Sequence, residues 1–216
     1  MKRTFLTLIS ALCFTVFGQT QVVDTFSNCH SDKHSNLPCG WGPPRSWNDV
    51  GMYSLEQENG NYYVKVKTEG GVTTIGRPFP FKLSEYPLLS WSWRMHTLPK
   101  GADERVKKLG DSGAAVYVIF QGKLMRNRIL KYVWSTSLQM GTLTESPYNS
   151  RAKIIVLRSG EQDKGGWVQE TVNLVEDYKR LFGGTPPAVE GIAILSDGDN
   201  TNSLVEADYD DFQVSR

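Results

Sequence analysis

The chain has 216 residues, of which 39% are hydrophobic and 11% aromatic, and its formal net charge at pH 7 is +1. This apolar content excludes a disordered chain, and the length suits a single domain of the β-sandwich or β-barrel kind. A near-neutral charge without a dense basic stripe argues against nucleic acid as a partner, because phosphate binding needs a basic surface.

The first segment has the order of a secretory signal peptide. Lys2 and Arg3 precede an apolar run over residues 5–17, and the small residue Gly18 follows. We therefore predict that residues 1–18 are removed and that the protein is secreted or periplasmic. The cysteine within the run lacks the small residue that precedes a lipoprotein cysteine, which disfavours a lipid anchor. The run is too short for a transmembrane helix, and we expect no transmembrane segment in the mature chain.

Two cysteines remain in the mature chain, Cys29 and Cys39. An even pair in an exported protein favours a disulfide, which would add roughly 2–3 kcal/mol of stability by closing a short loop. His30 and His34 lie between the cysteines, so a zinc site with two cysteine and two histidine ligands is the alternative. The spacing fits no common zinc finger, and we therefore favour the disulfide.

Two stretches predict the central strands of a β-sheet protein. Residues 88–95 place Trp91 and Trp93 on one face and polar side chains on the other, which is typical of a strand with one buried face. Residues 114–120 are apolar on both faces, as in a strand covered on both sides. Two prolines within residues 78–80 suit an edge strand. Further strands are expected at residues 62–67, 72–75, 79–83, 130–135, 153–158, 167–172, 189–195 and 204–214.

One short helix is predicted over residues 174–182. Its apolar side chains recur at helical spacing, and Asn173 precedes it as an N-cap, with Glu176 at the third position. Gly183 follows as a stop signal. About ten short strands and one helix predict an all-β fold, a jelly-roll-like antiparallel β-sandwich that forms one domain over residues 24–216.

An oxygen-rich turn is the first candidate site. Asp197, Asp199 and Asn200 lie in a run of oxygen-bearing side chains over residues 197–203. Oxygens at alternate positions can face a hard cation, so calcium is a candidate cofactor, with Asp197 and Asp199 as metal ligands. The run lacks the glycine and the bidentate glutamate of an EF-hand loop. Such turns also arise because Asp and Asn side chains bond their own backbone, and a ligand-site rim without metal is a further alternative.

A second group of candidates combines an arginine, a charged loop and aromatic residues. Arg94 lies on the polar face of the tryptophan strand, where a guanidinium could clamp a carboxylate or a pair of sugar hydroxyls. The charged loop that follows contains Asp103 and Asp111, and long loops between strands often carry sites. Arg94 could instead pair with one of these aspartates. Tyr132 and Trp134 offer faces for sugar stacking, although most large aromatics of a sandwich lie in its core.

The sequence leaves catalysis open. No Gly-x-Ser-x-Gly nucleophile motif occurs. Glycoside hydrolysis needs two carboxyl groups about 5–9.5 Å apart, and the aspartates named above could supply such a pair. A polysaccharide lyase would instead need a base, such as Tyr132 or His96, and a neutralising group, such as Arg94.

Several motifs resemble one known family. They are Trp91-Ser-Trp93-Arg94, the segment from Leu98-Pro99 to Asp103, Asp111 followed by Val-Tyr-Val-Ile-Phe, Lys131-Tyr132-Val-Trp134, Trp167, Asp177-Tyr178, Phe182-Gly183 and Ser196-Asp197-Gly-Asp199-Asn200-Thr201. Over nearly the whole mature chain this pattern resembles domain-of-unknown-function family 3047 of exported bacterial proteins. The chain departs from the pattern in having serine where the aspartate turn begins with threonine. The resemblance implies an exported domain of unassigned activity with a carbohydrate-module-like sandwich, and it supplies no catalytic residue.

We therefore predict an exported β-sandwich that binds a carbohydrate, that is, a glycan or polysaccharide ligand. The predicted ligand-binding residues are Arg94, Asp103, Asp111, Tyr132, Trp134, Asp197, Asp199 and Asn200. The alternatives are a polysaccharide-active enzyme, either a hydrolase or a lyase, and a structural envelope protein whose motif residues only hold loops in place.

Overall fold

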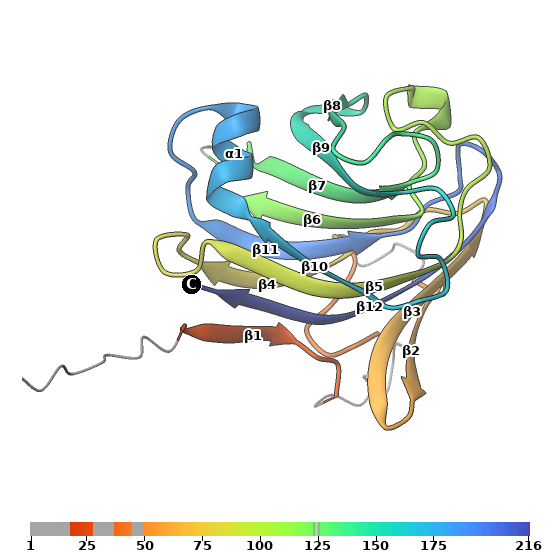
Figure 1. Ribbon diagram of the computed structural model, residues 1–216, viewed down its shortest axis with the longest axis horizontal. Coiled ribbons are helices and arrows are strands. Elements are labelled where there is room, and N and C mark those ends of the chain that lie inside the picture. Colours follow the sequence, from red (N-terminus) through yellow and green to blue (C-terminus); the bar gives the residue numbers. More distant parts are fainter. Residues whose placement is uncertain (1–17, 28–36, 45–49, 123, 125) are drawn as a thin grey trace, which may run out of the picture.

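The computed structural model describes residues 18–27, 37–44, 50–122, 124 and 126–216. Twelve strands in this part of the chain form two sheets that pack face to face as a sandwich (Figure 1). The strands are β1 (Thr20–Asp24), β2 (Tyr53–Glu58), β3 (Asn61–Glu69), β4 (Ile75–Phe81), β5 (Leu88–Thr97), β6 (Ala114–Phe120), β7 (Arg128–Ser135), β8 (Leu143–Ser146), β9 (Asn149–Ser159), β10 (Val168–Asn173), β11 (Val189–Leu195) and β12 (Leu204–Ser215).

We call the two layers sheet A and sheet B. Sheet A has the strand order β10-β5-β12-β3-β2, with β1 also paired to β12, and sheet B has the order β4-β11-β6-β7-β9-β8. Among the described strands β7 and β9 pair in parallel, whereas the other neighbours are antiparallel. The predicted all-β sandwich is therefore confirmed, with one parallel pair inside a largely antiparallel sheet. This pair arises because the chain returns through β8 before it enters β9.

The sequence did not reveal every strand. The short strands β1, β2 and β8 were not expected, and the predicted strand over residues 72–75 does not form. Instead, β4 runs through Pro78 and Pro80 without a break and lies at one edge of sheet B. Its edge position is the one expected from two residues that lack an N–H donor.

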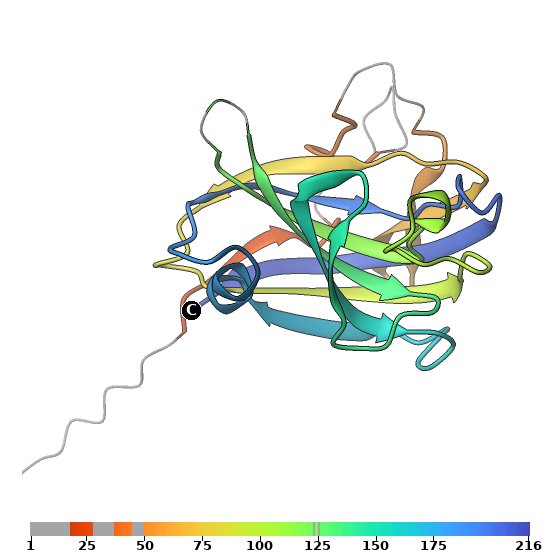
Figure 2. The same cartoon turned by 90° about the horizontal axis from the view of Figure 1, so that it is seen from above.

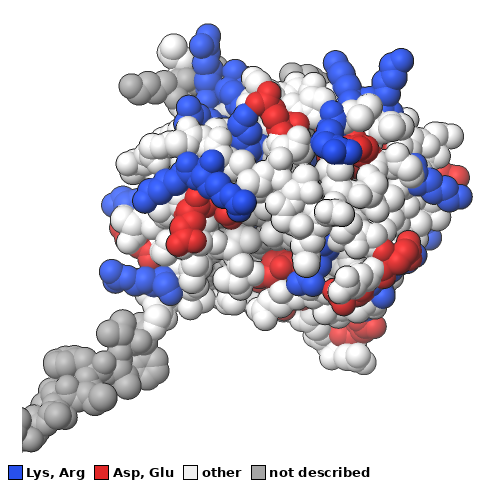
Figure 3. Space-filling view, turned by 45° about the horizontal axis from the view of Figure 1, so that its top comes forward, with Lys and Arg blue, Asp and Glu red and all other residues white. Residues whose placement is uncertain are grey.

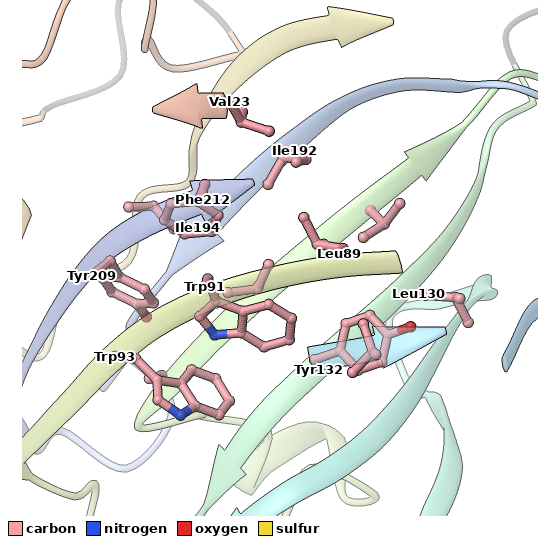
Figure 4. Close-up of a cluster of buried hydrophobic side chains, with 14 of the residues drawn as sticks. Val23, Leu89, Trp91, Trp93, Leu130, Tyr132, Ile192, Ile194, Tyr209 and Phe212 are labelled. Carbon is pink, nitrogen blue, oxygen red and sulfur yellow. The ribbon is translucent and has the colours of Figure 1, made fainter. Parts of the chain in front are cut away.

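The aromatic core lies between the two sheets (Figure 4). Trp91 and Trp93 of β5 meet edge to face, with ring centres 5.4 Å apart. Trp91 also packs on Tyr132 of β7 at 5.6 Å, and Trp93 packs on Trp134 of the same strand at 5.9 Å. Because aromatic pairs of this kind contribute strongly to core stability, β5 and β7 hold the two sheets together.

Helix α1 (Leu174–Phe182) lies at the end of the sandwich that also carries the C-terminus (Figure 2). The Asn173 side chain accepts hydrogen bonds from the backbone N–H groups of Val175 and Glu176 at 3.1 and 3.2 Å. Gly183 follows with φ of 69°, a conformation that favours glycine. The predicted helix and its N-cap are confirmed. The structure contains no helix, within the ranges it describes, that is long and apolar enough to cross a membrane.

The outer face of sheet B is also apolar and buried. A second cluster of buried side chains there includes Ala115, Val133, Ile154 and Leu195. Part of its cover is the loop between β5 and β6, where the Ala102 carbonyl accepts a hydrogen bond from the Ser137 hydroxyl at 2.7 Å. This cluster explains why β6 is apolar on both faces, and the loops around it form the site described below.

Some predictions fall on residues that the structure does not describe. They are the signal peptide, whose residues 1–17 lie outside the described part, and the group Cys29, His30 and His34. Both the Cys29–Cys39 disulfide and its zinc alternative therefore stay predictions, as does export.

Candidate functional site

A cavity of about 330 Å³ opens on the outer face of sheet B. Its floor includes Tyr117, Ile129 and Ile154 from the central strands, and Tyr148 from the β8–β9 turn stands at its rim. The side of the molecule that carries β8 and β9 shows basic and acidic side chains interspersed around a broad uncharged area (Figure 3). The cavity thus has an apolar floor, onto which a few buried polar groups converge.

Lys131 of β7 is the basic group of the cavity. It is 6% exposed, and its Nζ donates a hydrogen bond to Ser112 Oγ at 2.8 Å. The same ammonium lies 5.4 Å from the centre of the Tyr117 ring. Burial opposes its charge, but the Tyr117 hydroxyl and the carboxylates of Asp197 and Glu104 outweigh this effect and raise the pKa of Lys131. The cavity floor therefore carries a fixed positive charge at neutral pH.

Asp197 lies next to this charge, two residues after the end of β11. Its Oδ1 accepts a hydrogen bond from the Ser112 backbone N–H at 2.6 Å. Burial raises the pKa of Asp197 to about 7, although Lys131 and the Ser112 amide act in the opposite direction. The carboxyl group therefore exchanges its proton near neutral pH, which suits a group that responds to a ligand.

Glu104, from the loop between β5 and β6, is the second buried acid that lines the cavity. It is 1% exposed, and its Oε2 accepts a hydrogen bond from the Ser135 hydroxyl at 2.6 Å. Its other oxygen, Oε1, has no hydrogen-bond partner among the described residues. Burial raises the pKa of Glu104, against the opposing effect of the Ser135 hydrogen bond.

Three aspartates meet beside the cavity. Asp111, Asp197 and Asp199 each place a carboxylate oxygen within 4.8 Å of the others, and oxygen ligands of this kind suit calcium. The Asp111 carboxylate already accepts hydrogen bonds from the backbone N–H groups of Asn200 and Thr201 at 3.1 and 2.8 Å, and from the Thr201 hydroxyl at 2.6 Å. Asp111 therefore fixes the turn between β11 and β12, and calcium binding stays a prediction.

The rim is held by contacts between loops that are distant in the sequence. The Tyr148 hydroxyl contacts the Lys107 carbonyl and the Asn200 side chain. Gly110 lies so close that a Cβ placed there would stand 2.8 Å from the Tyr148 ring. The tyrosine therefore packs directly on the backbone of the β5–β6 loop, and the predicted site residue Asn200 lies at the rim of the cavity.

The structure separates Arg94 from these residues. Arg94 lies on the outer face of sheet A, where it pairs with Asp208 at 2.7 Å and with Glu58 at 3.0 Å. Its guanidinium also lies 4.6 Å from the centre of the Trp167 ring. The alternative in which Arg94 pairs with Asp103 or Asp111 was therefore wrong, because Arg94 pairs with a buried carboxylate on the neighbouring strand β12.

The remaining predicted residues also lie apart from the cavity. Asp103 pairs with Arg105 at 2.6 Å, and this hydrogen-bonded pair lowers the pKa of Asp103. Tyr132 and Trp134 are 0% exposed in the core, where their polar atoms bond Asp177 Oδ2 at 2.8 Å and the Gly160 carbonyl at 3.0 Å. Neither aromatic face is presented to the surface of the described chain.

Sequence reasoning missed Glu104 and Lys131 as site residues. Glu104 stands in a charged run beside Asp103 and Arg105, and nothing in the sequence marks it as the buried member. Lys131 carries a weak signal, because it is a single charge inside the apolar run Ile129-Leu-Lys-Tyr-Val133. In a strand covered on both faces, such a charge must find a polar site.

Comparison with known proteins identifies the family. Residues 45–213 match the model of the family described as protein of unknown function (DUF3047). The chain belongs to this family. No curated protein matches it.

Solved structures resemble this DUF3047 member only distantly. A family 30 carbohydrate-binding module of Clostridium thermocellum shares 10% identity at a TM-score of 0.41, with 77% of this chain and 83% of that chain covered. The xyloglucanase domain of a type three effector from Sinorhizobium fredii shares 12% sequence identity at a TM-score of 0.44, with 82% of this chain and 93% of that chain covered. The family GH12 endoglucanase 3 of Trichoderma harzianum shares 9% sequence identity at a TM-score of 0.43, with 93% of this chain and 98% of that chain covered.

The motifs that carried the DUF3047 resemblance have two roles in the structure. Trp91 and Trp93 build the core, whereas Asp111, Lys131 and the turn over residues 196–201 surround the cavity. The cavity offers an apolar floor, one ammonium group and several carboxyl groups within a small volume. Chemically, this arrangement can bind a polar ligand that also has an apolar face, or it can exchange protons with such a ligand.

Proposed function

We propose that this protein binds a carbohydrate in the cavity on the outer face of sheet B. The observation that carries the proposal is the convergence of three buried ionisable groups, Lys131, Glu104 and Asp197, on a largely apolar floor. Ligand pockets of roughly 300–1,000 Å³ have such a lining, with a few placed polar groups that set the orientation of the ligand. A sugar ring matches it, because the ring has apolar C–H faces and hydroxyl groups around its edge.

A melting-temperature screen against a glycan panel tests the proposal. A ligand at 100 times its Kd should stabilise the folded state by roughly 2.7 kcal/mol, which is measurable as a shift in Tm. The shift should be lost in Lys131→Met, because the substitution removes the ammonium and keeps an unbranched side chain. It should persist in Lys65→Met, a matched strand lysine on sheet A that pairs with Glu206. No shift with any glycan would overturn the proposal.

A second candidate is hydrolysis of the bound glycan. It is favoured by one observation, the raised pKa values of two carboxyl groups, Asp197 and Glu104, that line the same cavity. For Asp197 burial raises the pKa to about 7, which suits a general acid that works near neutral pH. A reducing-end assay on the glycans that raise Tm would detect turnover. Binding without new reducing ends would show that the protein binds the glycan and does not hydrolyse it.

We also propose that the domain acts outside the cytoplasm. Support comes from the basic, apolar and small-residue order of residues 1–18. Sequencing the N-terminus of the exported protein would test this proposal. A mature protein that still begins at Met1 would contradict it.

A further inference from the structure

Acidic groups outnumber basic groups around the cavity. Among the described residues that line it, Glu104, Asp197 and Asp199 carry carboxyl groups, whereas Lys131 carries an ammonium group. Asp111 adds a further carboxylate within 4.8 Å of both aspartates. At this separation the carboxylates repel each other, and an added positive charge would relieve that repulsion.

A second observation is independent of the aspartates. Glu104 is 1% exposed and lines the cavity, yet no group in the described part of the chain donates to its Oε1. Buried polar atoms of native proteins nearly always have a hydrogen-bond partner. A carboxylate oxygen accepts hydrogen bonds only. The free oxygen therefore indicates that a donor from a ligand completes the site.

Lys131 does not supply this donor. Its ammonium bonds the Ser112 hydroxyl at 2.8 Å and lies over the Tyr117 ring, which fixes its position on β7. Ser135 donates to the other oxygen of Glu104, so that Oε1 keeps its accepting capacity. The ammonium group of Lys131 is therefore held in place by the protein, and Glu104 Oε1 can still accept a hydrogen bond from a cationic ligand.

We infer that the ligand is an amino sugar with a free ammonium group, held by Glu104 and by Asp197 and Asp199, which line the same cavity. This inference rests on the proposed carbohydrate binding. An ammonium group brings three donors and a positive charge, and a hydrogen bond between charged partners is stronger than one between neutral partners. A neutral sugar lacks the charge, an N-acetylated sugar has lost it, and a uronic acid adds a further carboxylate.

Isothermal titration calorimetry of the purified protein tests the inference. The ligands are glucosamine oligomers, N-acetylglucosamine oligomers and oligogalacturonate of equal length, and calcium chloride alone. We expect glucosamine oligomers to bind at least about tenfold more tightly than the acetylated ones, because they add a charged hydrogen bond.

Variants separate a binding role of Glu104 from a structural one. Glu104→Gln keeps the shape and removes the charge, and it should reduce the preference for the glucosamine oligomer while affinity for the acetylated one stays. Asp199→Asn, at the exposed rim, should reduce the preference without a folding risk. The matched control is Glu145→Gln, an exposed glutamate on β8 that pairs with Lys153. It should change neither affinity.

The outcomes distinguish the inference from the proposed function. Equal binding of the two oligomers, or tighter binding of oligogalacturonate, would overturn the inference and leave carbohydrate binding standing. If calcium binds in the absence of sugar and displaces the sugar, the acidic groups form a metal site, and this result would also overturn the inference. An absence of binding by all sugars would overturn both.

Discussion

Asp111 makes the contact that holds the cavity wall, and its removal should be costly. Its carboxylate is fully buried and accepts three hydrogen bonds from Asn200 and Thr201, in a turn about 90 residues away along the chain. A hydrogen bond to a charged group contributes about 1.5–3 kcal/mol. The bonds form one network, so their contributions do not add fully.

One effect acts in the opposite direction. Burial is the main cause of the raised pKa values of Asp197 and Asp199, and the charge of Asp111 adds to it. Asp111→Ala removes that charge, and the relief of this repulsion offsets part of the loss. We therefore expect the free energy of unfolding to fall by about 2–3 kcal/mol, because three donors lose their buried acceptor.

Urea denaturation measures this difference, with the slope m held constant between variants. Glu161→Ala is the matched control, because Glu161 pairs with Lys164 at the surface at 2.6 Å, and exposed pairs contribute only about 0–1 kcal/mol. A loss for Asp111→Ala no larger than that of the control would refute the reasoning. It would mean that water replaces Asp111 at the turn without penalty.

Three further predictions follow from the core, the cavity and the helix. Trp93→Ala should lower the free energy of unfolding, measured by urea denaturation, by about 3–5 kcal/mol, because the ring is fully buried against Trp91 and Trp134. Trp167 is half-exposed, so Trp167→Ala is the control, and an equally small effect of the two substitutions would contradict this packing. The pKa of Asp197 rises from 3.8 to about 7 on folding, because the folded state favours the protonated form. The free energy of unfolding should therefore be highest below about pH 4 and should fall by up to about 4 kcal/mol as the pH rises through 7. Asp197→Asn should therefore weaken the decline of Tm between pH 5 and 8, and an unchanged slope would assign that decline to other acids such as Asp210. Asn173→Ala should lower stability by about 1 kcal/mol through loss of the helix cap, measured as a shift in the urea midpoint, whereas a neutral effect would show that water caps α1 equally well.

The fold was predictable where one face of an element differs from the other. The alternation around Trp91 and Trp93 predicted β5, and the cap at Asn173 predicted α1 with its observed bounds. Local patterns did not predict that β9 would enter sheet B parallel to β7, because pairing between distant strands depends on the whole chain. The short edge strand β8 is half-exposed and has no clear period.

The site was predictable only in part. The turn with Asp197, Asp199 and Asn200 was identified from its oxygen side chains, and Asp111 was identified from its loop. Tyr132 and Trp134 were assigned to a ligand, but the alternation that places them on one face does not say which face of the sheet is covered. Glu104 gains its importance from burial by residues far along the chain, a property that its neighbours in the sequence do not encode.

The two outer strands of sheet B affect how the protein behaves at high concentration. A long regular edge strand offers unpaired N–H and C=O groups to another chain and so promotes aggregation. In β4, Pro78 and Pro80 remove two of these donors, and β8 at the opposite edge is only four residues long. Both edges are therefore poor templates for edge-to-edge association. Replacing Pro78 and Pro80 with β-branched residues would be expected to promote self-association while leaving the cavity unchanged.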